Sequence, residues 1–209
     1  MRLRRSEWMV LAFNLLYIAG FFAYFTLIAN REFIGYILTM LALMALVAVV
    51  HLKVQFPVGI LWGLSGWGLA HMAGGGVPVN GSVLYNAMVL PLFGTGELRV
   101  LKYDQLVHFY GFAVTAWLLW YLLAKLFPAM RGSRSILVFA ALASMGLGAM
   151  NEIVEFTAVM LIPNTNVGGY FNTALDLVFN GLGAATAMVI RAMFPGDVAI
   201  ALPNRAEVS

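Results

Sequence analysis

Residues 103–127 read YDQLVHFYGFAVTAWLLWYLLAKLF. A helix needs about 20 mostly apolar residues to cross a hydrocarbon core, and most of this stretch is apolar. Two ionisable residues, Asp104 and His108, lie near its beginning. They are four positions apart, so they lie on one face of the predicted helix. The stretch therefore predicts a membrane-spanning helix with a polar site near one of its ends.

Five further segments have the same apolar character, and together the six predict an all-α polytopic membrane bundle. The predicted spans are residues 8–29, 33–51, 56–73, 105–127, 136–161 and 173–194. Hydrophobic residues make up 62% of the chain and charged residues 10%, whereas a soluble domain is about one-quarter charged. Because the spans leave little length for anything else, we expect residues 1–209 to form a single transmembrane domain.

A segment rich in glycine and proline separates the third and fourth predicted spans. Gly74, Pro78, Gly81, Pro91 and Gly94 interrupt it, and such residues favour turns over a continuous helix. We therefore expect a loop here rather than another span.

The basic residues predict the orientation of the bundle. Nine would lie on the side of the two termini and three on the opposite side. The nine are Arg2, Arg4, Arg5, Lys53, Lys125, Arg131, Arg134, Arg191 and Arg205, and the three are Arg31, Arg99 and Lys102. Because basic residues concentrate on the cytoplasmic side, both termini are predicted to be cytoplasmic and the Gly/Pro-rich loop external. The net charge of +3 reflects these orienting residues, which argues against a nucleic-acid partner and leaves membrane lipids as the expected surroundings.

Three of the spans carry polar pairs at the predicted external level. Carboxylates at hydrocarbon depth are costly, so their presence on three spans indicates a buried functional pocket. The members of each pair are three or four residues apart, so they lie on one helical face. His71 ends the third span on the same side. The candidate catalytic residues are Asp104, His108, Glu152, Glu155, Asp176 and Asn180.

Four of these residues are carboxylates, and they cannot all stay ionised and unpaired in a low-dielectric site. Protonation, a cationic ligand or a bound cation would compensate them. The chain has no cysteine, so a metal would have oxygen and imidazole ligands, which suit Mg, Mn, Zn or Fe. The candidate metal ligands are His108, Glu155, Asp176 and His71. The spacing matches no diagnostic metal motif, and a packing network of hydrogen-bonded acids is the alternative.

The polar motifs resemble those of a known family. Residues 103–109 (YDQLVHF), 151–156 (NEIVEF), 176–183 (DLVFNGLG) and 69–75 (LAHMAGG) are similar to motifs of the YjdF-type bacterial inner-membrane family and, more distantly, of VanZ-like proteins. The resemblance implies a small polytopic protein of the bacterial inner membrane. VanZ-like proteins are associated with glycopeptide resistance, but they have Asp-Glu and a following Gln where this chain has Asn151, Glu152 and Glu155.

Two functional hypotheses remain open at this stage. The first is a metal-dependent membrane enzyme that acts on a lipid or a lipid-linked envelope substrate. The second is a non-catalytic protein, either an accessory subunit with protein partners or a protein that binds or transports a cation. The absence of a broken helix pair at the midplane argues against alternating-access transport.

Overall fold

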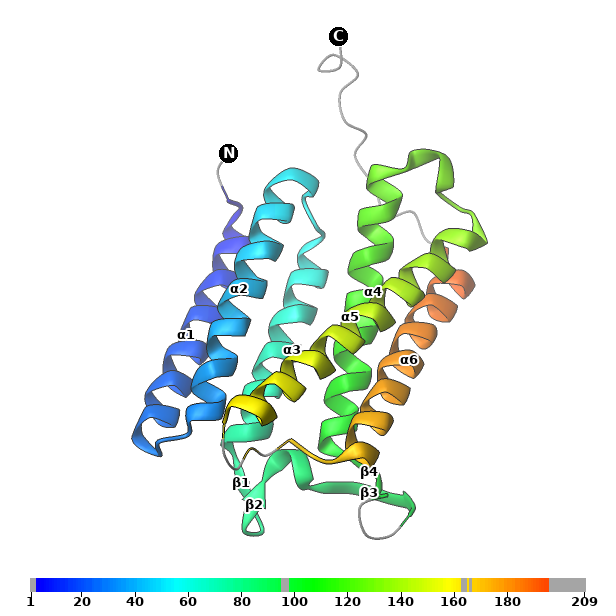
Figure 1. The fold of residues 1–209 in the computed structure, drawn as a ribbon. Coiled ribbons are helices and arrows are strands. Elements are labelled where there is room, and N and C mark those ends of the chain that lie inside the picture. The colour runs from blue at the N-terminus through cyan, green and yellow to red at the C-terminus, as the bar shows by residue number, and fades with distance from the viewer. Residues whose placement is uncertain (1–2, 95–97, 163–164, 166, 196–209) are drawn as a thin grey trace.

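In the part of the chain that the structure describes, the apolar segments form six helices that run alternately up and down, and Figure 1 shows this arrangement in the computed structural model. The structure describes residues 3–94, 98–162, 165 and 167–195. The helices are α1 (Arg5–Leu27), α2 (Arg31–Val54), α3 (Val58–Gly76), α4 (Tyr103–Leu126), α5 (Arg134–Leu161) and α6 (Tyr170–Met193). The predicted helix bundle is confirmed.

Five of the six helices are long and apolar enough to cross a membrane, and α3 is the exception. It has 19 residues, but glycines, Ser65 and His71 interrupt its apolar sequence. Helix α3 packs against both α1 and α4, and only Gly59 and Trp62 along it are exposed. A helix surrounded by other helices has less need of apolar side chains.

The segment between α3 and α4 folds into two short antiparallel sheets rather than an irregular loop. Strands β1 (Pro78–Val79) and β2 (Ser82–Val83) form the first sheet. A single 3-10 turn, η1 (Leu84–Asn86), leads to β3 (Met88–Phe93), which pairs with β4 (Val100–Lys102). A second 3-10 turn, η2 (Pro128–Met130), joins α4 to α5.

The two ends of the bundle differ in what they carry. The loop end comprises both sheets, the α1–α2 connection and the α5–α6 connection, whereas the terminal end comprises the start of α1 and the end of α6 (Figure 1). The helix bounds put seven of the predicted cytoplasmic basic residues at the terminal end. They also put Arg31, Arg99 and Lys102 at the loop end. Arg2 and Arg205 lie outside the described residues.

Local signals in the sequence fix where several helices begin and end. The side chain of Asn30 accepts a hydrogen bond from the backbone of Phe33 at the start of α2. Ser133 does the same for Ile136 at the start of α5. Such caps satisfy backbone donors that the first turn leaves without partners. Gln55 ends α2 in the left-handed conformation, with a φ of 58°.

Helices α4, α5 and α6 pack against one another and form the part of the bundle that holds the polar pairs. Gly183 lets α6 approach α4 closely, because a Cβ there would lie 2.0 Å from the carbonyl oxygen of Phe109. The hydroxyl of Ser144 on α5 donates to the carbonyl oxygen of Phe112 on α4 at 2.8 Å. These contacts bring three polar helix faces together near the loop end.

Candidate functional site

His108 lies between the polar faces of α4, α5 and α6. Its Nδ1 atom is 3.0 Å from Oδ1 of Asn180 and 3.8 Å from Oε1 of Glu152. Its Nε2 atom is 3.7 Å from Oδ1 of Asp104. An amide oxygen can only accept, so the bond to Asn180 requires a proton on Nδ1. In the neutral imidazole, Nε2 then presents its lone pair on the side of Asp104.

Asn172 links the carboxylates of α4 and α6. Its Nδ2 atom donates to Oδ2 of Asp104 at 3.1 Å and to Oδ2 of Asp176 at 2.6 Å. Its Oδ1 atom accepts from Nζ of Lys102 at 2.5 Å. Asn172 therefore holds two acidic side chains side by side, and Lys102 supplies a positive charge next to them. We call the set Asp104, His108, Glu152, Glu155, Asn172, Asp176 and Asn180 the His108 cluster.

Several polar atoms of the cluster are buried and have no hydrogen-bond partner among the described residues. They are both carboxylate oxygens of Glu152, Oδ1 of Asp176 and Nδ2 of Asn180. Glu152 is 8% exposed and Asp176 is fully buried. A buried polar atom without a hydrogen-bond partner costs about 1 to 3 kcal/mol, and more when it is charged, and a proton or a cation relieves that cost at a carboxylate. The protein's own side chains thus leave acceptor capacity unused at the centre of the cluster.

The spacing of these atoms suits a metal ion. Asp104, His108 and Asp176 each offer a ligand atom, and the three atoms lie within 4.8 Å of one another. His108, Glu152 and Glu155 form a second such group. Two ligands that are each about 2.1 Å from one ion lie no more than about 4.2 Å apart. The separation of 3.7 Å between His108 and Asp104 is below that limit.

Glu155 extends the cluster toward α2 and α3. Its Oε1 atom accepts a hydrogen bond from Nδ2 of Asn151 at 2.9 Å. A cavity of about 30 Å³ is lined by Glu155, Asp104 and Asn172, together with residues of α2, α3 and η1. That volume is enough for at least one water molecule or ion. We call it the polar cavity.

His71 also lines the polar cavity, but it belongs to neither group of candidate ligands. Its backbone carbonyl accepts from the hydroxyl of Tyr85 at 2.9 Å, and its Nδ1 atom is 2.6 Å from the same hydroxyl. Because the phenol donates to the carbonyl, its oxygen accepts from Nδ1, which leaves Nε2 of His71 with the lone pair. Burial raises the pKa of Tyr85 well above its ordinary value, so the phenol remains a donor.

The structure brings all six candidate catalytic residues into one cluster, on the helices that the sequence predicts. Sequence reasoning missed Asn172 and did not place Lys102 in the site. Asn172 is four residues before Asp176, the spacing that places two side chains on one helical face, and this was the available signal. The sequence places Lys102 beside the fourth predicted span, and its bond to Asn172 brings it to the edge of the cluster.

Comparison with known protein families gives a match over most of the chain. The model of a family described as predicted membrane protein (DUF2238) matches residues 8–196, and so includes every residue of the His108 cluster. No curated protein and no solved structure matches the chain.

Proposed function

The chain belongs to the DUF2238 family of predicted membrane proteins, and we propose that it is a metal-dependent membrane enzyme acting on a lipid or lipid-linked substrate. The observation that carries this proposal is the pair of buried carboxylates, Glu152 and Asp176, with oxygens that lack hydrogen-bond partners among the described residues. A divalent cation would compensate this buried charge, and the free Oδ1 atom of Asp176 would be one of its ligands.

The proposed ligands are Asp104, Asp176 and Nε2 of His108. Their atoms lie close together, and the lone pair of Nε2 is on the side of Asp104. Asn180 orients the imidazole through Nδ1, as second-shell groups commonly do for histidine ligands. Asn172 positions both aspartates. A ligand set of two carboxylates and one imidazole with open positions is typical of catalytic rather than closed structural sites.

Glu152 and Glu155 are then available for proton transfer, because they belong to the second group around His108. A metal held by the other group would polarise a phosphoryl or carbonyl oxygen or activate a water molecule. Lys102 carries a positive charge at the edge of the site, where an anionic head group would be attracted. These roles fit hydrolysis or transfer at a polar head group near the membrane surface.

We further propose that the protein lies in the bacterial inner membrane with both termini in the cytoplasm. Among the described residues, seven basic side chains lie at the terminal end and three at the loop end, which is the distribution expected for a cytoplasmic terminal end. The His108 cluster would then act in the outer leaflet.

The alternative is a non-catalytic role, as an accessory subunit or a cation-binding protein, with the cluster serving as a packing network. One experiment separates the two. The metal content of the purified full-length protein is measured for the wild type, for Asp176→Asn and for Glu7→Gln, a matched neutralisation at the terminal end. Each protein is then incubated with a membrane lipid extract, and the products are followed by mass spectrometry.

The proposal expects bound metal with the wild type and with Glu7→Gln, a changed lipid species with the wild type, and neither bound metal nor lipid conversion with Asp176→Asn. A folded wild-type protein without metal would contradict the enzyme and favour the packing network. Bound metal without any conversion of lipid would favour the cation-binding alternative.

A further inference from the structure

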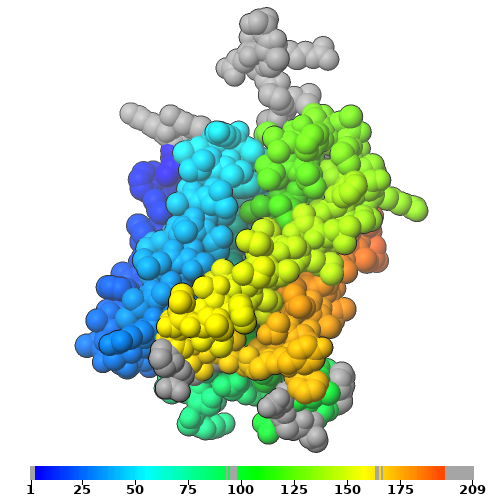
Figure 2. Space-filling view, viewed as in Figure 1, coloured from blue at the N-terminus to red at the C-terminus, as the bar shows by residue number. Residues whose placement is uncertain are grey.

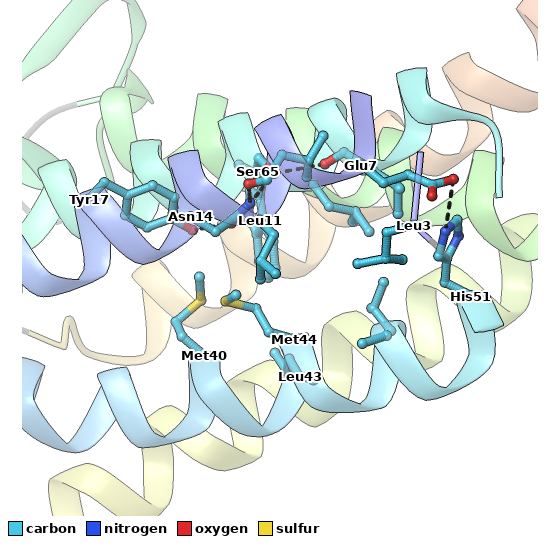
Figure 3. A pocket seen from close by; sticks show the side chains of 16 residues that line it. Leu3, Glu7, Leu11, Asn14, Tyr17, Met40, Leu43, Met44, His51 and Ser65 are labelled. Atoms are coloured by element: carbon cyan, nitrogen blue, oxygen red, sulfur yellow. Dashed lines mark hydrogen bonds and ion pairs between the residues drawn. The ribbon is translucent and has the colours of Figure 1, made fainter. Parts of the chain in front are cut away.

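A second cavity lies between α1, α2 and α3, and Figure 3 shows its side chains. It has a volume of about 190 Å³, larger than a cavity of about 150 Å³ that stays dry and holds benzene. Its walls are mostly aliphatic and include Leu11, Met40, Leu43 and Met44, which Figure 3 labels. We call it the tail cavity.

The polar residues on its walls already bond to one another. Nδ2 of Asn14 donates to Oγ of Ser65 at 2.6 Å, and Oδ1 of Asn14 accepts from the hydroxyl of Tyr17 at 2.9 Å. Glu7 accepts two hydrogen bonds from Arg4, and it faces Nε2 of His51 at 3.3 Å (Figure 3). A ligand in this cavity therefore meets hydrocarbon and satisfied polar groups. Such a lining suits an apolar ligand.

Two smaller cavities lie between the tail cavity and the His108 cluster, and neighbouring cavities share lining residues. The tail cavity shares Met40, Leu43 and Trp67 with a small cavity of about 20 Å³. This small cavity in turn shares Tyr36, His71 and Glu155 with the polar cavity. Met40 separates two of the spaces, and an unbranched methionine side chain rearranges readily.

We infer that these cavities form a single binding path, in which the polar cavity receives a head group and the tail cavity receives the hydrocarbon tail of the same molecule. This inference rests on the proposed function and specifies its substrate as a single amphiphile with a long tail. The observation behind it is the continuity of walls from Glu155 at the cluster to Met40 and Leu43 at the tail cavity.

The length of the path favours a ligand with a long tail. Tyr36 and His51 mark its two ends on α2, and they are about 22 Å apart at the helical rise of about 1.5 Å per residue. One leaflet contributes only about 15 Å of the hydrocarbon core, half of about 30 Å. A tail that follows the path thus passes the membrane midplane, and an extended octyl chain is too short to do so. The part of a hexadecyl or polyprenyl tail that the cavity does not enclose would lie along the exposed side of Leu43 and Ala48.

The tail can enter from the side. Leu43 and Ala48 line the tail cavity and are also exposed on the surface of the bundle. In the space-filling view of Figure 2, α2 and α5 form the front face of the molecule, with a recess between them. A lipid-linked molecule would reach the path from the membrane without leaving the hydrocarbon region.

The test uses photoreactive phosphates as probes. Octyl, hexadecyl and polyprenyl phosphates with a diazirine on the tail are added to the full-length protein in vesicles of phosphatidylethanolamine and phosphatidylglycerol. The crosslinked residues are then mapped by mass spectrometry. We expect the hexadecyl or the polyprenyl probe to label Met40 and Met44, which line the cavity and are not exposed, in preference to exposed residues of α2. Comparison of these two probes identifies a straight or an isoprenyl tail.

Val47→Phe would fill the tail cavity, because Val47 lines it. Val49→Phe is the matched control, since Val49 is 55% exposed and faces away from the cavity wall. We expect Val47→Phe to reduce labelling about tenfold, the factor that corresponds to about 1.4 kcal/mol of overpacking, and Val49→Phe to leave it unchanged. Equal labelling of the two variants, or the strongest labelling with the octyl probe, would overturn the inference.

Asp176→Asn separates this inference from the proposed function. The tail cavity does not include Asp176, so labelling at Met44 should persist in this variant when its metal is lost. Labelling at Met44 in a wild-type protein that binds no metal would support the tail site and contradict the proposed enzyme. Metal binding without labelling at Met44 would support the metal site and contradict the tail site.

Discussion

Each end of the bundle contains a buried carboxylate beside an imidazole, but the two pairs differ in how they are satisfied. At the terminal end, Glu7 accepts hydrogen bonds from the backbone and the guanidinium of Arg4, and Nδ1 of His51 accepts from the backbone of Phe56 at 3.1 Å. At the loop end, Glu152 lies 3.8 Å from His108, and neither of its oxygens has a hydrogen-bond partner among the described residues.

The difference shows that burial of charge does not by itself identify a ligand site. Glu7 and Glu152 are both 8% exposed, yet only Glu152 retains unused acceptor atoms. A satisfied pair stabilises the fold locally, whereas an unsatisfied cluster requires a proton or a ligand from outside. We therefore assign a structural role to Glu7 and His51 and a functional role to the His108 cluster.

The largest contrast expected between the two ends is their exposure to opposite sides of the membrane. A cysteine at Asn80, in the turn between β1 and β2, should be labelled from outside the cell by a reagent that does not cross the membrane. A cysteine at Ser133, before α5, should be labelled only after the membrane is opened. Thr95, another suitable position in the predicted external loop, lies outside the described residues. The reverse labelling pattern would place the His108 cluster in the cytoplasmic leaflet.

Metal removal should affect the loop end and leave the terminal end unchanged. A ligand present at 100 times its dissociation constant stabilises a protein by about 2.7 kcal/mol. Chelation should therefore lower the melting temperature of the wild type and of Glu7→Gln by several degrees. It should have no effect on Asp104→Asn, which lacks a proposed ligand. If chelator left the melting temperature of each of the three proteins unchanged, a metal at the cluster would be contradicted.

Substitutions at Asn180 and Asn14 should differ in their effect on metal affinity, and this difference is smaller than the two above. Asn180→Leu removes the partner of Nδ1 of His108, and loss of such a second-shell bond typically costs 10- to 100-fold in metal affinity. Asn14→Leu removes a comparable buried amide near the middle of α1, outside the cluster, and should leave the affinity unchanged. Titration of the metal-free proteins with a divalent cation would give both values. A similar loss of metal affinity in the two variants would indicate that both substitutions act by lowering the stability of the protein.

Part of this site was predictable from the sequence, because helical periodicity decides which side chains share a face. Asp104 and His108 are one helical turn apart, and so are Asp176 and Asn180, so their grouping follows from spacing. The six helices were predictable for the same reason, since about 20 apolar residues suffice to cross a membrane.

Other features depend on contacts between distant segments, which spacing does not reveal. The bond between Lys102 and Asn172 joins residues 70 positions apart, and the bond between Asn14 and Ser65 joins residues 51 positions apart. The strands of the loop end were missed because the glycines and prolines around them obscure any alternation of apolar and polar residues. The pairing of Glu7 with His51 was also missed, since the two residues come from different helices.

The smallest expected effect concerns stability in the absence of metal, and it tests the comparison most directly. Glu7→Gln keeps the shape of the side chain but replaces a charged acceptor of Arg4, whose side chain is 61% exposed and therefore screened by solvent. We expect it to lower the free energy of unfolding by about 1 kcal/mol. Glu152→Gln should leave the stability of the metal-free protein unchanged or raise it, because a buried charge without a hydrogen-bond partner among the described residues is removed. Chemical unfolding of both variants in chelator would measure these differences. If Glu152→Gln were the more damaging of the two, its carboxylate would have a structural partner, and the distinction between the two ends would fail.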